Sequence, residues 1–135
     1  MNLKWVILIT IIAMLSCQSS IEKHDLLLDF KVESRSPENL RQIRSFEEKG
    51  FLDKPVKLST KQIADTLRIN FEIFEGASTE IEGNIEIRKD SLILKIGKGI
   101  GIRELMIHEY QYEIFNPMKE EYKIRIENYV EIDEL

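Results

Sequence analysis

Residues 80–97, EIEGNIEIRKDSLILKIG, contain the pattern that decides the fold of this chain. Two runs in which apolar and polar residues alternate flank Lys89 and Asp90, and such alternation predicts two half-buried β-strands joined by a two-residue turn. In this register the large apolar side chains share one face, and the pairs are Ile87 with Leu92, Ile85 with Leu94, and Gly83 with Ile96. The stretch therefore predicts an antiparallel hairpin with one face in a core.

Alternation of the same kind recurs along the chain and predicts a mainly β fold. It is clearest in residues 26–33 and 66–75, and it appears again on both sides of Asn116-Pro117, a dipeptide typical of a type I turn. A second antiparallel hairpin is predicted there, with the pairs Ile114 with Tyr122, Tyr112 with Ile124, and Tyr110 with Ile126. We expect an antiparallel β-sandwich, or a small barrel, of about seven to eight strands.

One short helix is predicted between the first two strands. Ser36 is a suitable N-cap, Pro37 suits the first turn, and Gly50 is a typical end. Its apolar stripe is narrow and its charges are many, so the helix needs the sheet for stability.

The first 17 residues have the composition of an export signal. A basic start is followed by an apolar run over residues 5–15, which is too short to cross a bilayer of about 30 Å as a helix. The run ends in Met14-Leu15-Ser16-Cys17, which resembles the lipobox of bacterial lipoproteins. The resemblance implies that Cys17 receives a diacylglycerol group and that a peptidase cuts before it. The alternative is a plain signal peptide or an uncleaved anchor with an incidental thiol.

The expected domain organisation follows from this resemblance. Residues 1–16 are the signal peptide, residues 17–25 a lipidated polar tether, and residues 26–135 a single β-rich domain. Cys17 is the only cysteine, so no disulfide can form within the chain. Gln18 stands where an aspartate would, in this family, favour the inner membrane, so the resemblance implies an outer-membrane lipoprotein that faces the periplasm.

The charge of the chain excludes one class of partner. The full chain has 19 basic and 24 acidic residues, a formal net charge of −5. Residues 1–16 contain one lysine and no acid, so their removal leaves 18 basic and 24 acidic residues, a charge of −6. Nucleic acid requires a basic face and is not expected as a partner. A protein partner with a basic surface is the expected alternative.

No motif predicts a reaction. The chain contains no HExxH, G-x-S-x-G or CxxC sequence, so we expect no catalytic residues, metal or cofactor. Glycines surround Lys98 but do not precede a helix as in a phosphate loop. The alternation changes phase at His108-Glu109, which predicts a β-bulge, and bulges lie preferentially near functional sites. The predicted binding surface therefore combines Lys98, Gly99, His108 and Glu109.

The hairpin also has a counterpart in other proteins. Its order of glycine, alternating strand, charged turn and alternating strand is similar to that of small β-rich lipoproteins of bacterial envelopes. The resemblance implies no particular activity, and the expected function is a non-catalytic binding or interaction module. Two alternatives remain open. One is a self-protection protein that blocks an envelope-targeting enzyme or toxin through its acidic surface. The other is a carrier of hydrophobic ligands, if the strands close into a hollow barrel.

Overall fold

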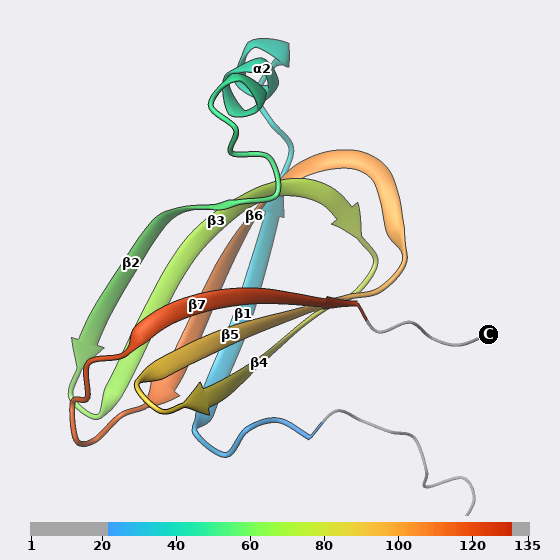
Figure 1. The fold of residues 1–135 in the computed structure, drawn as a ribbon. Coiled ribbons are helices and arrows are strands. Elements are labelled where there is room, and N and C mark those ends of the chain that lie inside the picture. Colours follow the sequence, from blue (N-terminus) through green and yellow to red (C-terminus); the bar gives the residue numbers. More distant parts are fainter. Residues whose placement is uncertain (1–21, 131–135) are drawn as a thin grey trace, which may run out of the picture.

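The computed structural model describes residues 22–130 (Figure 1). Seven strands form two stacked β-sheets, and there is one helix. The lipobox, Cys17 and most of the predicted tether lie outside this range, as do residues 131–135. The predicted β-sandwich with one short helix is confirmed, and the described strands do not close into a barrel.

The larger sheet has four antiparallel strands. In spatial order they are β1 (Leu27–Arg35), β6 (Gly101–Phe115), β3 (Thr66–Ser78) and β2 (Pro55–Ile63). The smaller sheet has three strands, which are β4 (Ile81–Arg88), β5 (Ser91–Lys98) and β7 (Lys123–Val130). Figure 1 shows the strands of the smaller sheet crossing those of the larger one at a steep angle.

The predicted central hairpin is confirmed in register. Strands β4 and β5 pair Ile87 with Leu92, Ile85 with Leu94, and Gly83 with Ile96. Lys89 has a φ of 55°, and a positive φ at the first turn residue is what a two-residue hairpin turn requires.

The predicted second hairpin is wrong. Strand β7 does not pair with β6 but runs parallel to β5 in the other sheet, with Ile124 beside Leu92 and Ile126 beside Leu94. Asn116 organises the crossing between the sheets, because its side chain donates to the Glu120 carbonyl and accepts from the Glu120 amide, at 3.1 and 3.2 Å. Alternation could not reveal this, since the same residues of β7 face the core with either partner.

The space between the sheets is filled by side chains. Aromatic rings of the larger sheet stack on one another, with Phe71 and Tyr110 centroids 5.1 Å apart. Phe30 of β1 lies directly against Gly83 of β4, where even a methyl group would overlap the ring. A carrier function inside a hollow barrel therefore has no structural basis in the described residues. The core comprises Leu67, Ile69, Phe71, Ile73, Ile85, Leu92, Leu94, Ile96, Tyr110, Tyr112 and Ile114.

Helix α2 (Leu40–Glu48) lies outside the sandwich, at one end of the larger sheet (Figure 1). It begins later than predicted: the N-cap is Asn39 rather than Ser36, and the Asn39 side chain accepts from the Gln42 amide at 2.9 Å. Phe46 stacks on Phe74 of β3, with centroids 4.8 Å apart. The helix thereby covers the outer face of the sheet at this end. No helix between residues 22 and 130 is long and apolar enough to cross a membrane.

This cover explains the phase change in β6. Ile107 pairs with Phe74 on the covered outer face, and the next residue, His108, points inward and is also buried. Both faces of β6 are covered at this point, so consecutive residues are buried although the pairing with β3 stays regular. The predicted bulge at His108-Glu109 is therefore wrong. The register shift lies earlier in β6, between Ile102 and Leu105.

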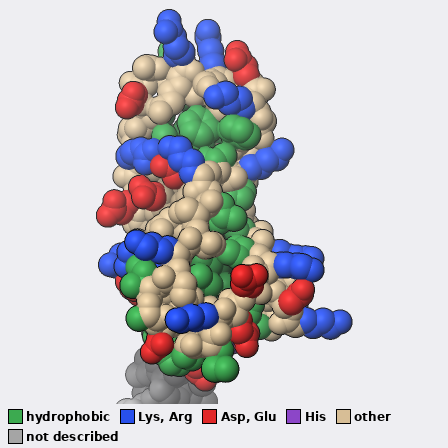
Figure 2. Space-filling model, turned by 90° about the vertical axis from the view of Figure 1, so that its left-hand side faces the viewer, with side chains coloured by type: hydrophobic (Ala, Val, Ile, Leu, Met, Phe, Trp, Pro, Cys, Tyr) green, Lys and Arg blue, Asp and Glu red, His purple; other side chains and the backbone are tan. Residues whose placement is uncertain are grey.

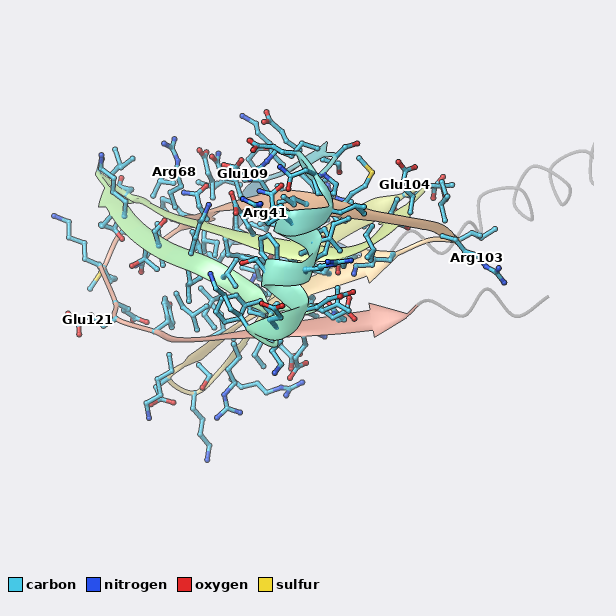
Figure 3. All side chains as sticks on the ribbon, turned by 90° about the horizontal axis from the view of Figure 1, so that it is seen from above. Arg41, Arg68, Arg103, Glu104, Glu109 and Glu121 are labelled. Carbon is cyan, nitrogen blue, oxygen red and sulfur yellow. The ribbon has the colours of Figure 1, made fainter. Side chains whose placement is uncertain are left out.

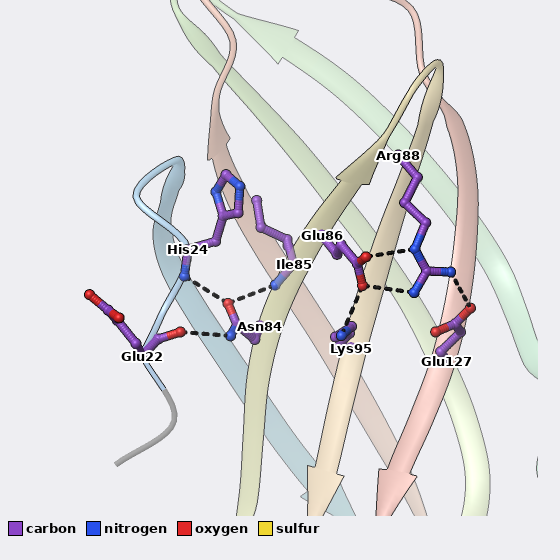
Figure 4. A network of polar contacts seen from close by, with 8 residues as sticks. All are labelled: Glu22, His24, Asn84, Ile85, Glu86, Arg88, Lys95 and Glu127. Carbon is purple, nitrogen blue, oxygen red and sulfur yellow. Dashed lines mark hydrogen bonds and ion pairs between the residues drawn. The ribbon is translucent and has the colours of Figure 1, made fainter. Parts of the chain in front are cut away.

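The described part of the predicted tether is held by β4. The Asn84 side chain accepts from the His24 amide at 2.8 Å and donates to the Glu22 carbonyl at 3.1 Å (Figure 4). Strand β1 then begins with a register shift between Leu27 and Asp29. That shift leaves Leu28 53% exposed, although alternation predicted it to face the core with Phe30.

Candidate functional site

The four residues of the predicted binding surface do not form one surface. Gly99 and Glu109 are exposed, but His108 is only 1% exposed and cannot contact a partner. His108 and Glu109 are neighbours in a regular strand, so their side chains point to opposite faces of the sheet. Glu109 faces outward, where it lies 3.8 Å from Arg35.

Lys98 and His108 are instead brought together by Glu75, an inward-facing residue of β3. Glu75 is 1% exposed, forms an ion pair with Lys98 of the opposite sheet, and accepts a hydrogen bond of 2.6 Å from the Tyr110 hydroxyl. Burial, together with this hydrogen bond to Glu75, raises the pKa of Tyr110. Glu75, Lys98 and Tyr110 therefore form a buried polar cluster that joins the two sheets.

Ser34 completes this cluster on its exposed side. Its hydroxyl lies 2.5 Å from Nδ1 of His108, whose Nε2 lies 3.4 Å from the Gly76 carbonyl and 3.9 Å from Glu75 Oε1. Serine, imidazole and carboxylate are the parts of a nucleophile relay. Here, however, the carboxylate is beyond hydrogen-bond distance of the imidazole and is already bound by Lys98 and Tyr110. The arrangement is that of a structural network.

A groove lies on the other side of the larger sheet, between α2 and the start of β2. We call it the α2 groove, and its volume is about 570 Å³, within the range of small-molecule sites. Its apolar lining residues are Phe46, Phe51, Pro55 and Val56, and its polar ones are Gln42, Ser45, Lys49 and Lys57.

The chain between α2 and β2 is fixed at several points, and this creates the groove. Gly50 ends the helix with a φ of 67°, and the Phe51 amide donates to the Phe46 carbonyl at 2.9 Å. The Asp53 amide then donates to the Phe74 carbonyl at 2.9 Å, which ties the segment to the sheet. Phe46 and Phe51 thus line the same hollow from two directions.

The charged residues that line the α2 groove are Lys49 and Lys57, although the chain as a whole is acidic. Residues 35–57 include six basic and four acidic side chains, and Glu72, which pairs with Arg35 and Lys57, brings the formal charge of this group to +1 within a chain of −5. Figure 2 shows hydrophobic side chains gathered near the α2 end, with Lys and Arg above and on both sides. In Figure 3, Arg41 lies on α2, while Arg103 and Glu104 extend from the start of β6 on one side of the molecule and Glu121 lies on the other side.

Glu72 of β3 holds two of these basic side chains in place. Its carboxylate lies 3.1 Å from Lys57 Nζ and 3.1 Å from the Arg35 guanidinium. Burial alone would raise the pKa of Glu72, but the contacts with Lys57 and Arg35 outweigh burial and lower it. Glu72 therefore stays ionised at neutral pH and keeps Lys57 at the edge of the groove.

Neither the buried cluster around Glu75 nor the α2 groove was predicted from the sequence. Glu75 is the fifth inward-facing residue of β3, and the four before it are apolar. An acidic residue in the alternating position of the core face indicates a buried charge, and this was the one signal of the cluster in the sequence. The α2 groove depends on the packing of Phe46 on Phe74, which no local pattern predicts. Within residues 22–130 there is no group of three or more side chains suited to hold a metal ion.

Comparison with known proteins adds no relative: no family model matches the chain, and no match is found among curated proteins or solved structures.

Proposed function

We propose that this protein is a lipid-anchored binding module of the bacterial envelope and that the α2 groove is its ligand site. The observation that supports this is the groove itself: a hollow of about 570 Å³ with aromatic and aliphatic lining and a few polar side chains. The proposed module is not catalytic, because the Glu75 carboxylate is bound by Lys98 and Tyr110 and lies 3.9 Å from the His108 imidazole, too far to orient it toward Ser34.

The place of the groove in the fold suits an anchored protein. Strand β1 runs from the end of the molecule where the described chain begins to the end where α2 lies (Figure 1). Its nine residues span about 30 Å. A domain attached to the outer membrane through an acylated Cys17 would therefore present the groove to the periplasm, away from its own membrane.

The charge around the groove changes the expected ligand. The acidity of the whole chain led to the expectation of a basic partner, but the charged residues that line the groove are Lys49 and Lys57. A ligand of the α2 groove is expected to be acidic. A self-protection role through an acidic surface would have to use another face of the molecule.

Site-specific photocrosslinking in cells tests this proposal. A photoreactive amino acid replaces Ser45, which lines the groove, in the chain with its native amino terminus. The control carries the same amino acid at Glu82, an exposed position of β4. We expect a defined crosslinked species from position 45 and none from position 82. Equal crosslinking from both positions, or none from position 45 in a folded protein, would remove the groove as the ligand site.

A further inference from the structure

We infer that the ligand of the α2 groove is an anionic amphiphile, a single alkyl or acyl chain with a carboxylate or phosphate head. The inference rests on the proposed function and names the chemical class of its ligand. It depends on two features of the groove that lie side by side, an apolar floor and a basic edge.

The floor suits a hydrocarbon chain. Phe46 is held in place by its stack on Phe74, so this part of the groove is preformed. Phe51, Pro55 and Val56 continue the apolar lining around it. Three of these four lining residues have little rotamer freedom to lose when a ligand binds, because two are aromatic and one is proline.

The edge suits an anionic head. Lys49 follows the last turn of α2, and Lys57 lies in the irregular part of β2 between Val56 and Ser59, so the two ammonium groups reach the groove from different elements. Lysine stems pack along apolar surface while the ammonium stays in water, which is the geometry an amphiphile at a groove edge requires. Lys57 is oriented by its ion pair with Glu72. Gln42 and Ser45 add side chains that can donate hydrogen bonds.

Charge complementarity selects among amphiphiles with the same chain. A cationic head would meet Lys49 and Lys57, the charged residues of the lining, and an uncharged head would leave Lys49 without a ligand partner. Carboxylate and phosphate heads satisfy the same side chains, and they correspond to two sources, free fatty acids and phospholipid-derived ligands.

Titration with four probes of equal chain length tests the inference. The protein is the whole predicted mature chain, residues 17–135, with Cys17→Ala so that no detergent is needed. The probes are dodecanoate, dodecyl phosphate, dodecanol and dodecyltrimethylammonium, each below its micelle concentration. Binding is measured by calorimetry, and the site is mapped by backbone amide chemical shifts. We expect one or both anionic probes to bind about tenfold or more tightly than the cationic probe. Their ratio distinguishes carboxylate from phosphate ligands.

Matched charge reversals locate the head. Lys49→Glu should weaken binding of the anionic probe by about three- to fivefold, the scale of one exposed ion pair. Arg103→Glu makes the same change of charge at the start of β6, outside the groove lining, and should leave binding unchanged. Phe51→Asp should abolish binding of every probe because it places a charge in the floor.

Several results would overturn the inference. They are equal affinity for the anionic and cationic probes, equal effects of Lys49→Glu and Arg103→Glu, shifts that map away from the groove, or no binding of either anionic probe. A failure here leaves the proposed function to be judged by the crosslink at position 45. A crosslink from that position to a polypeptide would retain the groove as the site and reject the amphiphile.

Discussion

Glu75 and Lys98 share an ion pair between the sheets but differ in their access to water. Glu75 is 1% exposed, whereas the Lys98 side chain is 24% exposed and ends near the edge of the smaller sheet. A buried ion pair contributes little net stability against well-packed apolar residues, but removal of one partner leaves the other charge buried. Removal of Lys98 and removal of Glu75 should therefore lower the free energy of unfolding by different amounts.

We predict that Lys98→Met destabilises the protein by about 3 kcal/mol, because the buried Glu75 carboxylate would lose its cationic partner. Glu75→Gln should cost about 1 kcal/mol, since Lys98 can turn into solvent and the amide still accepts from Tyr110. Urea unfolding of the two variants measures the difference. A larger cost for Glu75→Gln would mean that Lys98 is as deeply buried as its partner.

The pH dependence of stability has a local source on the outer face of the smaller sheet. Hydrogen bonds from Arg88, with a further contribution from Lys95, lower the pKa of Glu86 to about 2. Figure 4 shows this group, which Arg88 extends to Glu127 at 3.8 Å. Because the folded-state pKa is depressed, the contribution of Glu86 to stability is fully present above the unfolded pKa of about 4.5 and is lost as the pH falls through about 2.

We predict that the difference in urea midpoint between the wild type and Glu86→Gln is largest at pH 6 and narrows between pH 4.5 and 2. The effect should be small, because the group is exposed to solvent. The exposed variant Glu82→Gln serves as the control and should show no such narrowing. A difference that grows on acidification would contradict the assignment.

At the scale of elements, the sequence predicts the β4–β5 hairpin but not the crossing of the chain from β6 to β7 in the other sheet. The alternation of β4 and β5 and the short turn between them determine partner and register together, so both could be predicted. Strand β7 has equally clear alternation, yet its partner is set by the turn at Asn116 and by the Lys123 amide, which donates to the Asp90 carbonyl at 2.9 Å. The start of α2 was misplaced because Ser36 and Asn39 are both acceptable caps, and the hydrogen bond from the Gln42 amide to the Asn39 side chain identifies Asn39 as the cap.

Engineered disulfides distinguish the observed pairing of β7 from the predicted hairpin. In a Cys17→Ala background, Lys95→Cys with Glu127→Cys should oxidise readily, since these residues are direct partners in adjacent strands. Glu113→Cys with Lys123→Cys, which the predicted hairpin would place opposite each other, should not form a bridge. Non-reducing electrophoresis and intact mass measure the outcome. The reverse result would restore the β6–β7 hairpin.

At the scale of the molecule, the sequence predicted the architecture better than the site. Two-residue alternation identifies which side chains face inward, and this was enough for a β-sandwich with a single helix. It says nothing about which inward residues from distant strands meet. Glu75 reaches Lys98 across the two sheets, and Phe46 reaches Phe74 across a loop. Candidate sites made of such contacts could not be predicted from spacing along the chain.

The proposed anchor leads to a prediction for the whole protein. Cys17→Ala should abolish metabolic labelling with a fatty acid and leave the protein either in the soluble fraction or with an uncleaved signal peptide. The acyl chains are the expected membrane contact, since two or three chains give stable anchoring where one is marginal. Ser19→Thr, which lies outside the Met14-Leu15-Ser16-Cys17 match and keeps the cysteine, is the comparison. Lipid on the Cys17→Ala protein, detected by mass spectrometry, would show that the attachment lies elsewhere.

Strand β1 links the proposed anchor to the proposed ligand site, and that has a mechanical consequence. It begins beside the residues that lead to the proposed anchor and ends next to α2, and it is already extended over its nine residues. If the groove held a ligand attached to another structure, tension between that ligand and the membrane would run largely along the covalent backbone of β1. An extended strand has almost no slack to give up. The hydrogen-bonded ladders and the core would then carry little of the load, and the sandwich could act as a tie under force without unfolding.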